Sequence, residues 1–560
     1  RFENRFRLNE RGGIEENGLP DVLYRNLGQF RFEQNIVGGR QFMTAKGTPI
    51  PGALLEWGLS VMFRDINRDG KPDIYVCNDF DGHDRLWLNA GAGRFREAPV
   101  LALRKTSMFS MGVDFADINR DGLDDFIVVD MLNMSHQTRK NQMVPRLQYS
   151  PVPGRYNDRP QRMHNTLFFN RGYGVFSEIA HFAGLAASDW SWGSVFIDVD
   201  LDGLEDLLVT NGVERNARHL DTILHLRKQR EGRELPKREI LLARRVFPAQ
   251  ATANAAFRNQ GDLRFTETAA EWGFGDEEIS HGLACGDLDG DGDLDLVVNN
   301  LRSPAGVYRN NSAKPRLAVR LSGPPGNAAG IGARIEVEHA ALTQSQEVIA
   351  GGRYLSSDDP MRVFAMSDGV ARLKVTWPDL TESVIEKAEP NRLYQVRYQA
   401  GTANSSAEKP SAALFNLLKF PVAQPHIETV SSDSQPLLPW SLGQDGPGAA
   451  WGDLDGDGWE DLAVASGRGG ATTLYRNEAG KRFSLLEPNT PLPKSARDAL
   501  AVLIAGGQLL QSFSNHDDGL AFGDMVTVSQ ADGSLRQTVA AKAASAGQLA
   551  MADVDGDGDL

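Results

Sequence analysis

The chain has 560 residues, a formal net charge of −15 and two cysteines. This length exceeds one ordinary domain, so we expect several cores or one large closed β architecture. The acidic balance argues against nucleic acid as a partner, and no stretch approaches the roughly 20 apolar residues that a membrane-spanning helix needs.

The two ends of the sequence indicate that the chain is a piece of a longer protein. The first residue is an arginine, no signal peptide is visible, and the last residues lie inside a sixth copy of the loop described next. We therefore expect that a signal or anchor could have been lost with a missing N-terminus.

A nine-residue acidic loop recurs along the chain. Each copy has Asp at position 1, Asp or Asn at position 3, Asp at position 5, Gly at position 6 and Asp at position 9, and a short apolar run follows. Five complete copies, numbered here as loops 1 to 5, start at residues 65, 117, 198, 287 and 453, and a sixth starts at residue 553.

The loop chemistry predicts calcium. Several carboxylates within nine residues repel one another, so the loop needs a cation. Calcium takes about six to eight oxygen ligands in flexible geometry, whereas magnesium prefers a small octahedral shell that retains water. We expect side-chain oxygens from positions 1, 3, 5 and 9 and a backbone carbonyl from position 7, with Gly at position 6 allowing the sharp turn.

The predicted calcium ligands form about five complete sites. They are Asp65, Asn67, Asp69, Lys71 and Asp73; Asp117, Asn119, Asp121, Leu123 and Asp125; Asp198, Asp200, Asp202, Leu204 and Asp206; Asp287, Asp289, Asp291, Asp293 and Asp295; Asp453, Asp455, Asp457, Trp459 and Asp461; and Asp553, Asp555 and Asp557 in the truncated copy.

Two other interpretations of the loop were weighed. An EF-hand needs a bidentate Glu at position 12 and a helix on either side. Position 12 is valine in every complete copy, within apolar runs typical of buried strands. A set of acidic turns without metal is the remaining alternative, because Asp and Gly are also common turn residues. Recurrence in one strand context favours calcium.

Strands precede and follow each loop. Downstream of the loops come strands that end in Asn, as at 86–89, 167–170 and 474–477. Each unit thus holds about four strands, the content of one propeller blade. These units resemble the FG-GAP/VCBS repeat family, whose calcium-loop blades also form the integrin α-subunit head. The resemblance covers most of 17–315 and 445–560 and implies an all-β fold of propeller blades.

We assign residues 1–315 to the first set of blades and expect insertions at 133–165 and 213–250. The first insertion is basic, and the second has a helical pattern around Leu220, Ile223 and Leu224. Each could bind a ligand or simply decorate a blade edge. The two cysteines, Cys77 and Cys285, lie in apolar strands, which favours free buried thiols.

From residue 316 the pattern changes to alternating, half-buried strands. We expect a separate small β domain at 316–399, of sandwich type. The segments 327–333, 351–357 and 376–379 resemble the ASPIC/UnbV domain, which follows FG-GAP blades in the cartilage acidic protein family. Leu380 stands where that family usually has Gly. Residues 400–430 are predicted to be a linker, and 431–560 a second, incomplete set of FG-GAP/VCBS blades that starts a second propeller.

Three functions fit the sequence. The first is a calcium-stabilised, secreted or cell-surface protein that binds a glycan or a protein, and the resemblance implies such an adhesive role. The second is a propeller-based enzyme such as a polysaccharide lyase, which needs a base or a carboxylate pair in a cleft. No such motif is visible, so we expect no catalysis. The third is a structural spacer of a surface assembly.

Overall fold

The fold is taken from a computed structural model. It describes residues 6–8, 14–16, 18–80, 82–142, 159–172, 174–230, 242–243, 245–340, 342–367, 369–399, 407–408, 448–467, 469–486, 492, 497, 499–513, 522–530, 532, 534–542 and 549–551. The sixth predicted loop, with Asp553, Asp555 and Asp557, lies outside these residues.

Each complete loop joins the first two strands of an antiparallel sheet, called here a blade. The second strand starts at position 9 of the loop and is entirely buried. Blades 1 to 3 consist of β7 (Gly58–Arg64), β8 (Asp73–Asn78), β9 (Arg85–Asn89) and β10 (Phe95–Glu97); β12 (Val113–Ala116), β13 (Asp125–Val128), β15 (Thr166–Asn170) and β16 (Phe176–Glu178); and β17 (Ser191–Ile197), β18 (Asp206–Asn211), β20 (Ala255–Asn259) and β21 (Phe265–Glu267).

Three further blades follow. They are β23 (Ser280–Gly286), β24 (Asp295–Asn300) and β25 (Gly306–Tyr308); β36 (Ala449–Gly452), β37 (Asp461–Val464), β38 (Thr473–Asn477) and β39 (Phe483–Leu486); and β40 (Ala499–Ala505), β41 (Gln508–Phe513), β42 (Phe522–Gln530) and β43 (Leu535–Lys542). In blade 6 a Gly506–Gly507 turn with positive φ replaces the loop. Blade 1 is extended by β5 (Gly38–Met43) and β6 (Pro49–Ala53), and β3 (Val22–Asn26) pairs with β4 (Phe32–Ile36).

The blades pack face to face, one after another, through their first strands. Their first strands lie against one another in the order β7, β12, β17, β23, β36 and β40, and β44 (Ala550–Met551) lies against β7. Apolar side chains fill each interface: Tyr75 and Phe126 meet between blades 1 and 2, and Val209 and Ile127 between blades 2 and 3. Both free cysteines are buried in these strands, as expected.

The arrangement of the last blades differs from the expectation of a second propeller. Blade 5 packs directly on blade 4, where Trp451 and Leu462 share one core with Ala284 and Val297. The physical reason is that the apolar side chains of β36 and β37 in blade 5 cover an apolar face of blade 4 that would otherwise be exposed to solvent. The two sets of blades therefore form one continuous stack. Of the predicted linker at 400–430, only β35 (Ala407–Glu408) is described, and it pairs with β34.

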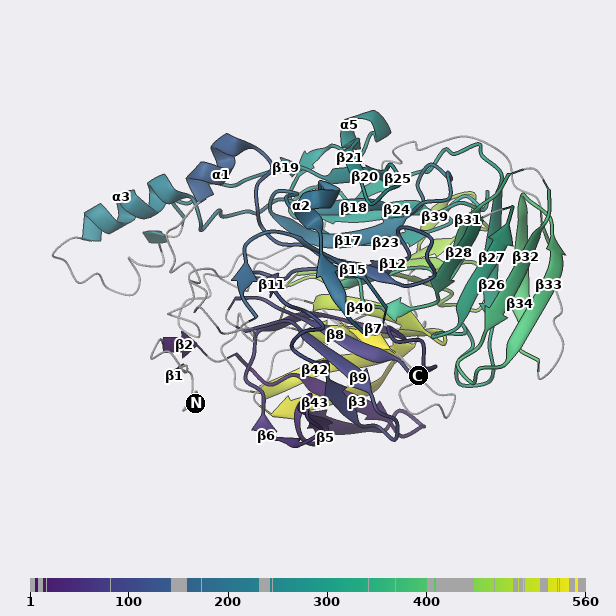
Figure 1. The fold of residues 1–560 in the computed structure, drawn as a ribbon, viewed down its shortest axis with the longest axis horizontal. Helices are drawn as coiled ribbons and strands as arrows, with labels where there is room; N and C mark the ends of the chain where they lie inside the picture. The colour runs from purple at the N-terminus through teal and green to yellow at the C-terminus, as the bar shows by residue number, and fades with distance from the viewer. Residues whose placement is uncertain are drawn as a thin grey trace.

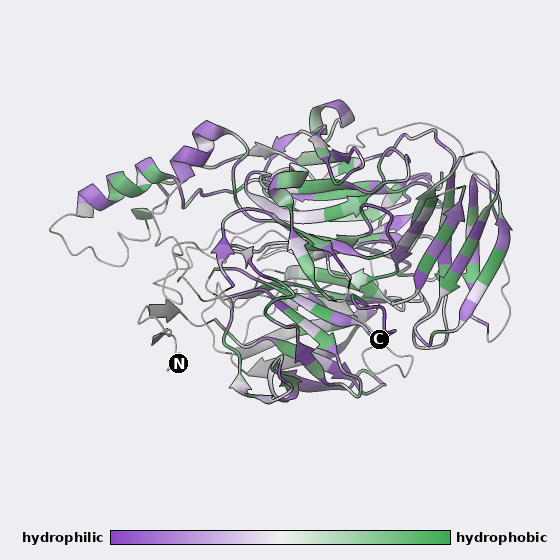
Figure 2. Cartoon of the chain, viewed as in Figure 1, coloured by the Kyte–Doolittle hydropathy of each residue, from purple (hydrophilic) through white to green (hydrophobic). Residues whose placement is uncertain are grey.

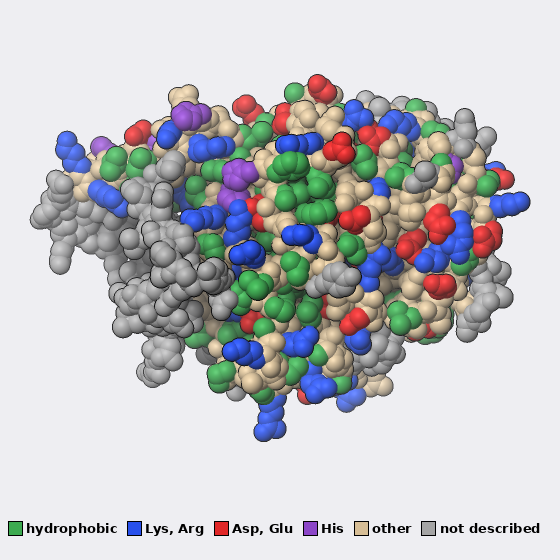
Figure 3. All heavy atoms as spheres, viewed as in Figure 1, with side chains coloured by type: hydrophobic (Ala, Val, Ile, Leu, Met, Phe, Trp, Pro, Cys, Tyr) green, Lys and Arg blue, Asp and Glu red, His purple; other side chains and the backbone are tan. Residues whose placement is uncertain are grey.

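Residues 316–399 form a sandwich, called here the sandwich domain. One sheet contains β26 (Arg316–Ser322), β31 (Arg362–Ala365) and β34 (Arg392–Arg397); the other contains β27 (Arg334–His339), β28 (Leu342–Glu347), β32 (Ala371–Thr376) and β33 (Glu382–Ala388). Alternating apolar residues of both sheets make its core, visible as alternating colours along the strands (Figure 2). Its outer face carries rows of paired charges such as Lys374 with Glu336 (Figure 3).

A segment of the sandwich domain enters the centre of the blade stack. β29 (Ala350–Gly351) pairs with β44, and β30 (Ser356–Ser357) pairs with β36. Between them Tyr354 and Leu355 are buried against Leu59, Trp192 and Ala501, which come from blades 1, 3 and 6. We call residues 350–357 the finger.

The two predicted insertions contain α1 (His136–Gln142) and α3 (Leu220–Arg230), and α3 confirms the predicted helix. These two helices touch and lie at the far end of the molecule from the sandwich domain (Figure 1). The Gln250 amide joins the insertions: Asn216 and Gln142 donate to its Oε1, and its Nε2 donates to Asn133.

Candidate metal centres in the repeated loops

The Asp at position 1 holds the turn of each loop together. In loop 3, Asp198 Oδ1 accepts the Asp202 N–H at 3.0 Å and Asp198 Oδ2 accepts the Gly203 N–H at 2.9 Å. The other four loops repeat this pair of hydrogen bonds. Gly at position 6 is required because its φ lies between 81° and 95° in all five loops.

The Asp at position 9 ties the loop to its blade. In loop 3, Asp206 Oδ2 accepts the Val199 N–H at 3.0 Å, and Asp206 Oδ1 accepts the N–H of Asn259 at 2.8 Å. Asn259 ends the third strand of the blade, and its side chain donates to the carbonyl of Glu205. The same Asp–Asn contact recurs in every complete loop, at Asn89, Asn170, Asn310 and Asn477. The recurrent Asn was visible in the sequence, but its role was not inferred.

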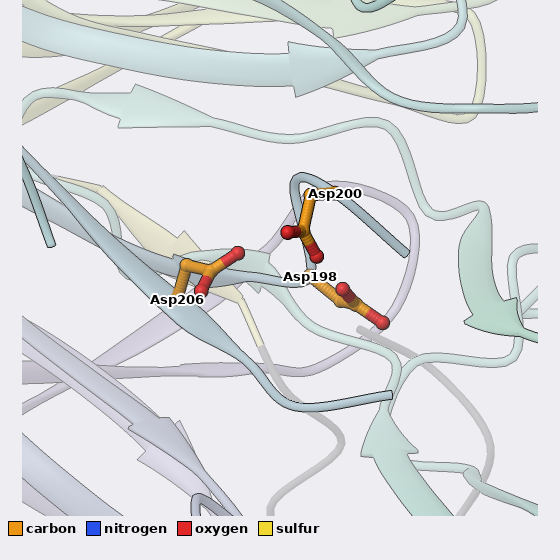
Figure 4. Close-up of side chains that lie close together, drawn as sticks. All are labelled: Asp198, Asp200 and Asp206. Carbon is orange, nitrogen blue, oxygen red and sulfur yellow. The ribbon is translucent and has the colours of Figure 1, made fainter. Parts of the chain in front are cut away.

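Three loops bring three carboxylates together. Their oxygens lie within 4.8 Å of one another in the groups Asp198, Asp200 and Asp206 (Figure 4); Asp287, Asp289 and Asp291; and Asp453, Asp455 and Asp461. In loops 1 and 2, position 3 is Asn67 or Asn119, whose side-chain oxygen accepts the N–H of position 5, as the Asp does in loops 4 and 5. These two loops offer amide oxygen in place of the third carboxylate.

A hydrogen bond to the carboxylate of position 5 holds the backbone of position 7 in each loop. The N–H groups of Lys71, Leu123, Leu204, Asp293 and Trp459 each donate to the position-5 carboxylate of their own loop. That the carbonyls of these residues bind the ion stays a prediction.

The donor set fits a divalent cation with oxygen ligands. Burial raises the pKa of Asp198, and that of Asp125, to about 8, so the ionised loop is disfavoured when no cation compensates it. Asp291 is 5% exposed, and its Oδ2 has no hydrogen-bond partner. A bound cation would supply the missing partner and remove the electrostatic cost.

Arginines of the third strand partly compensate the loops. Arg258 contacts Asp200 at 2.5 Å, Arg309 contacts Asp289 at 2.6 Å, and Arg476 contacts Asp455 at 2.9 Å. Each of these arginines directly precedes the Asn that contacts the position-9 Asp of its loop. Sequence reasoning missed these arginines, although a recurrent triplet of Phe or Tyr, Arg and Asn carried the signal.

Family models agree with this description. The model "FG-GAP-like repeat" matches residues 65–128 and 237–298, "FG-GAP repeat" matches 446–482, and "ASPIC and UnbV" matches 323–403. The fold and the loops define a protein of repeated β blades with a carboxylate-rich turn in blades 1 to 5. The chain thus contains FG-GAP repeats and an ASPIC and UnbV domain over the residues that these models match. Proteins with FG-GAP repeats are typically extracellular.

Solved structures show only distant likeness. An Agrocybe aegerita lectin, described as recognising non-reducing terminal N-acetylglucosamine, is 12% identical, with 84% of this chain and 89% of that chain covered and a TM-score of 0.28. The V. cholerae biofilm matrix protein Bap1 is 11% identical, with 97% and 83% covered and a TM-score of 0.23. No curated protein matches the chain. Among the described residues, no helix has the length and apolar character needed to cross a bilayer.

Proposed function

We propose that this protein is a calcium-stabilised extracellular binding protein whose loops hold structural calcium. The observation that carries the proposal is the hydrogen-bond scheme that the five loops share, together with the three carboxylates that each of loops 3, 4 and 5 brings within 4.8 Å of one another. Extracellular calcium modules work with Kd on the order of 0.1 to 1 mM. Each bound ion would stabilise the folded chain by about 1.4 kcal/mol when calcium stands at about ten times Kd.

The ligand surface is proposed at the end of the blades opposite the loops. The second strand of each blade starts at the loop, and the insertions with α1 and α3 leave from the far ends of β13 and β18. The exposed basic side chains of Lys140, Arg227 and Lys228 belong to these two helices. Figure 3 shows Lys and Arg side chains at this end of the molecule. Because a basic surface attracts negative charge, an acidic glycan or an acidic protein segment is the expected ligand.

The proposal is tested with the full chain on arrays of acidic and neutral glycans and on matrix proteins, in millimolar calcium and in excess chelator. Binding in calcium that falls in the Lys140→Glu/Arg227→Glu variant supports it, with Lys387→Glu/Lys481→Glu as the matched charge change elsewhere on the surface. No binding to any array contradicts a binding role and leaves the spacer function. Release of unsaturated products from an acidic polysaccharide would establish a lyase instead.

A further inference from the structure

The sandwich domain contacts loop 2 through a half-buried arginine. Arg334 of β27 donates two hydrogen bonds to Asp124, from Nη1 to Oδ1 at 3.1 Å and from Nη2 to Oδ2 at 2.9 Å. Asp124 is position 8 of the loop and is 2% exposed. It is not a predicted ligand, and its carboxylate is bound by the sandwich domain and by Arg64.

Loop 5 repeats this contact at the same position. Arg320 of β26 forms an ion pair with Glu460, which is position 8 of loop 5, and with Asp359 at 2.8 Å. Two loops on different blades thus present a carboxylate from position 8 to an arginine of the sandwich domain. A shared position in two loops indicates a built interface and not a chance pairing of surface charges.

Loop 1 has proline at position 8 and is held differently. Glu347, the last residue of β28, accepts the backbone N–H of Asp65 at 3.2 Å. Leu380 lies over the loop turn so closely that a Cβ at Gly70 would be 2.6 Å from its Cδ2. Leu380 is the residue that replaces the Gly usual in this family, and it supplies an apolar cap to the loop.

Loops 3 and 4 also meet the sandwich domain. Leu201, at position 4 of loop 3, packs with Ala318, Met361 and Val363. Arg316, the first residue of β26, donates to the Asp291 carbonyl at 2.8 Å and contacts the Asp291 carboxylate at 2.9 Å. The domain therefore touches every loop that the structure describes.

We propose that the sandwich domain is a calcium-dependent clasp, which binds the five loops in their calcium-binding shape so that docking and calcium binding strengthen each other. The inference rests on the proposed calcium function of the loops. Without an ion, the like charges of each loop repel and other loop shapes become populated. Most clasp contacts reach backbone groups, position-8 carboxylates or the apolar Leu201, none of which is a predicted side-chain ligand, and only Arg316 also contacts a predicted ligand, Asp291. These contacts depend on the shape of the loop. Because two events that favour one shape are linked, the coupling is reciprocal.

The finger limits how far the clasp opens. Tyr354 and Leu355 are 1% and 3% exposed in the centre of the stack, and neither touches a loop ligand. This anchor does not depend on calcium. Removal of calcium is therefore expected to loosen the strands that face the loops while the domain stays attached.

Hydrogen exchange of the full chain tests the clasp without any substitution. Peptides of β26 and β27 contain no predicted ligand, and peptides of the loops contain all of them. If the sandwich domain is a calcium-dependent clasp, chelator speeds hydrogen exchange both in the loop peptides and in the peptides of β26 and β27. Protection of the loops alone by calcium overturns the clasp and leaves the calcium sites intact. No calcium effect on either set overturns the calcium sites, and the clasp with them.

Calcium titration of variants tests the reverse direction. Arg320→Ala and Leu380→Ala remove clasp contacts at loops 5 and 1, and Arg372→Ala removes an arginine of the same domain that pairs with Glu338 and Glu386 away from the loops. Leu380 is 62% exposed, so its loss leaves the core intact. In Arg320→Ala and Leu380→Ala, we expect the calcium-binding step of lowest affinity to weaken about five-fold or more. Unchanged or tighter binding in both variants, with Arg372→Ala as the reference, overturns the clasp.

Discussion

Arg334 and Asp124 are 210 residues apart in the chain and form a bidentate ion pair in which the Asp124 carboxylate is buried. Burial raises the pKa of the Asp124 carboxyl, but Arg334 and Arg64 outweigh it and hold that pKa well below its usual range. The carboxylate is thus charged at any physiological pH. Asp124 precedes the predicted ligand Asp125, so this pair links the sandwich domain directly to loop 2.

Loss of this pair should cost more than loss of an exposed one. Arg334→Ala leaves Asp124 buried with Arg64 as its remaining partner, at 3.3 Å, so we expect the free energy of unfolding to fall by about 2–3 kcal/mol. Arg372→Ala removes an exposed ion pair and should change little. Denaturant unfolding of both variants in calcium measures the difference. Equal losses would show that the Arg334 contact is not formed.

The glycines at position 6 should differ in their tolerance of a side chain. Gly203 has φ +95°, and a Cβ there would be 2.7 Å from Leu342 Cδ2, whereas Gly458 has φ +88° and open space around it. Both Gly→Ala variants incur the cost of a positive φ, about 1 kcal/mol. Gly203→Ala should lose about 1 kcal/mol more, because Leu342 must leave its rotamer.

Thermal unfolding of Gly203→Ala and Gly458→Ala gives this difference directly. The variant Gly203→Ala/Leu342→Ala is the internal check, because the second substitution removes the clash. If Leu342→Ala restores none of the extra stability that Gly203→Ala loses relative to Gly458→Ala, loop 3 does not lie against β28.

His281 should make stability depend on pH. It is buried beside Trp192, and burial lowers its pKa to about 4 from 6.5. As the pH falls, the His281 imidazole therefore binds a proton in the unfolded chain before it does so in the folded chain. The stability that comes from its depressed pKa is present above pH 6.5 and is lost as the pH falls from 6.5 to about 4. Full loss amounts to about 3 kcal/mol.

Because carboxylates titrate in the same window, the His281→Gln variant is the informative comparison. The stability difference between the parent and His281→Gln should shrink as the pH falls from about 6.5 to 4, and His225→Gln, an exposed position, should follow the parent. A constant difference across this window would contradict a buried neutral His281.

The strand arginines should compete with calcium. Arg476 contacts Asp455 and Asp457 of loop 5 at 2.9 Å, so it stabilises the ion-free loop and repels a bound cation. Arg476→Ala should unfold at a lower temperature in chelator and bind calcium more tightly at loop 5, by less than about ten-fold since the side chain is exposed to screening solvent. Arg482→Ala, which removes only a pair with Glu478, is the control. Weaker calcium binding in Arg476→Ala would refute competition.

Local features of the fold could be predicted from the sequence, and long-range ones could not. Positions 1 to 9 of each loop and the strand that follows are encoded within a dozen residues, so Asp198 and Asp206 could be assigned to one turn. The sandwich strands follow from alternation alone. The continuation of blade 4 by blade 5 depends on the fit of Trp451 against Val297, across some 150 residues of intervening chain.

The contacts between the sandwich domain and the loops were equally invisible. Asp124 and Glu460 were extra acids with no local partner, and Arg334 and Arg320 were polar positions in alternating strands. Only the folded arrangement shows that these four side chains meet in two pairs.

Thermal unfolding in millimolar calcium and in excess chelator tests the central claim most directly. The parent is compared with Asp289→Ala and Asp455→Ala, which each remove a position-3 carboxylate, and with Asp221→Ala, an exposed Asp of α3 outside the loops. The account predicts a large rise of the parent midpoint in calcium, reduced in the two loop variants and unchanged in Asp221→Ala. Equal midpoints with and without calcium would mean that the loops are acidic turns and that calcium plays no part in this fold.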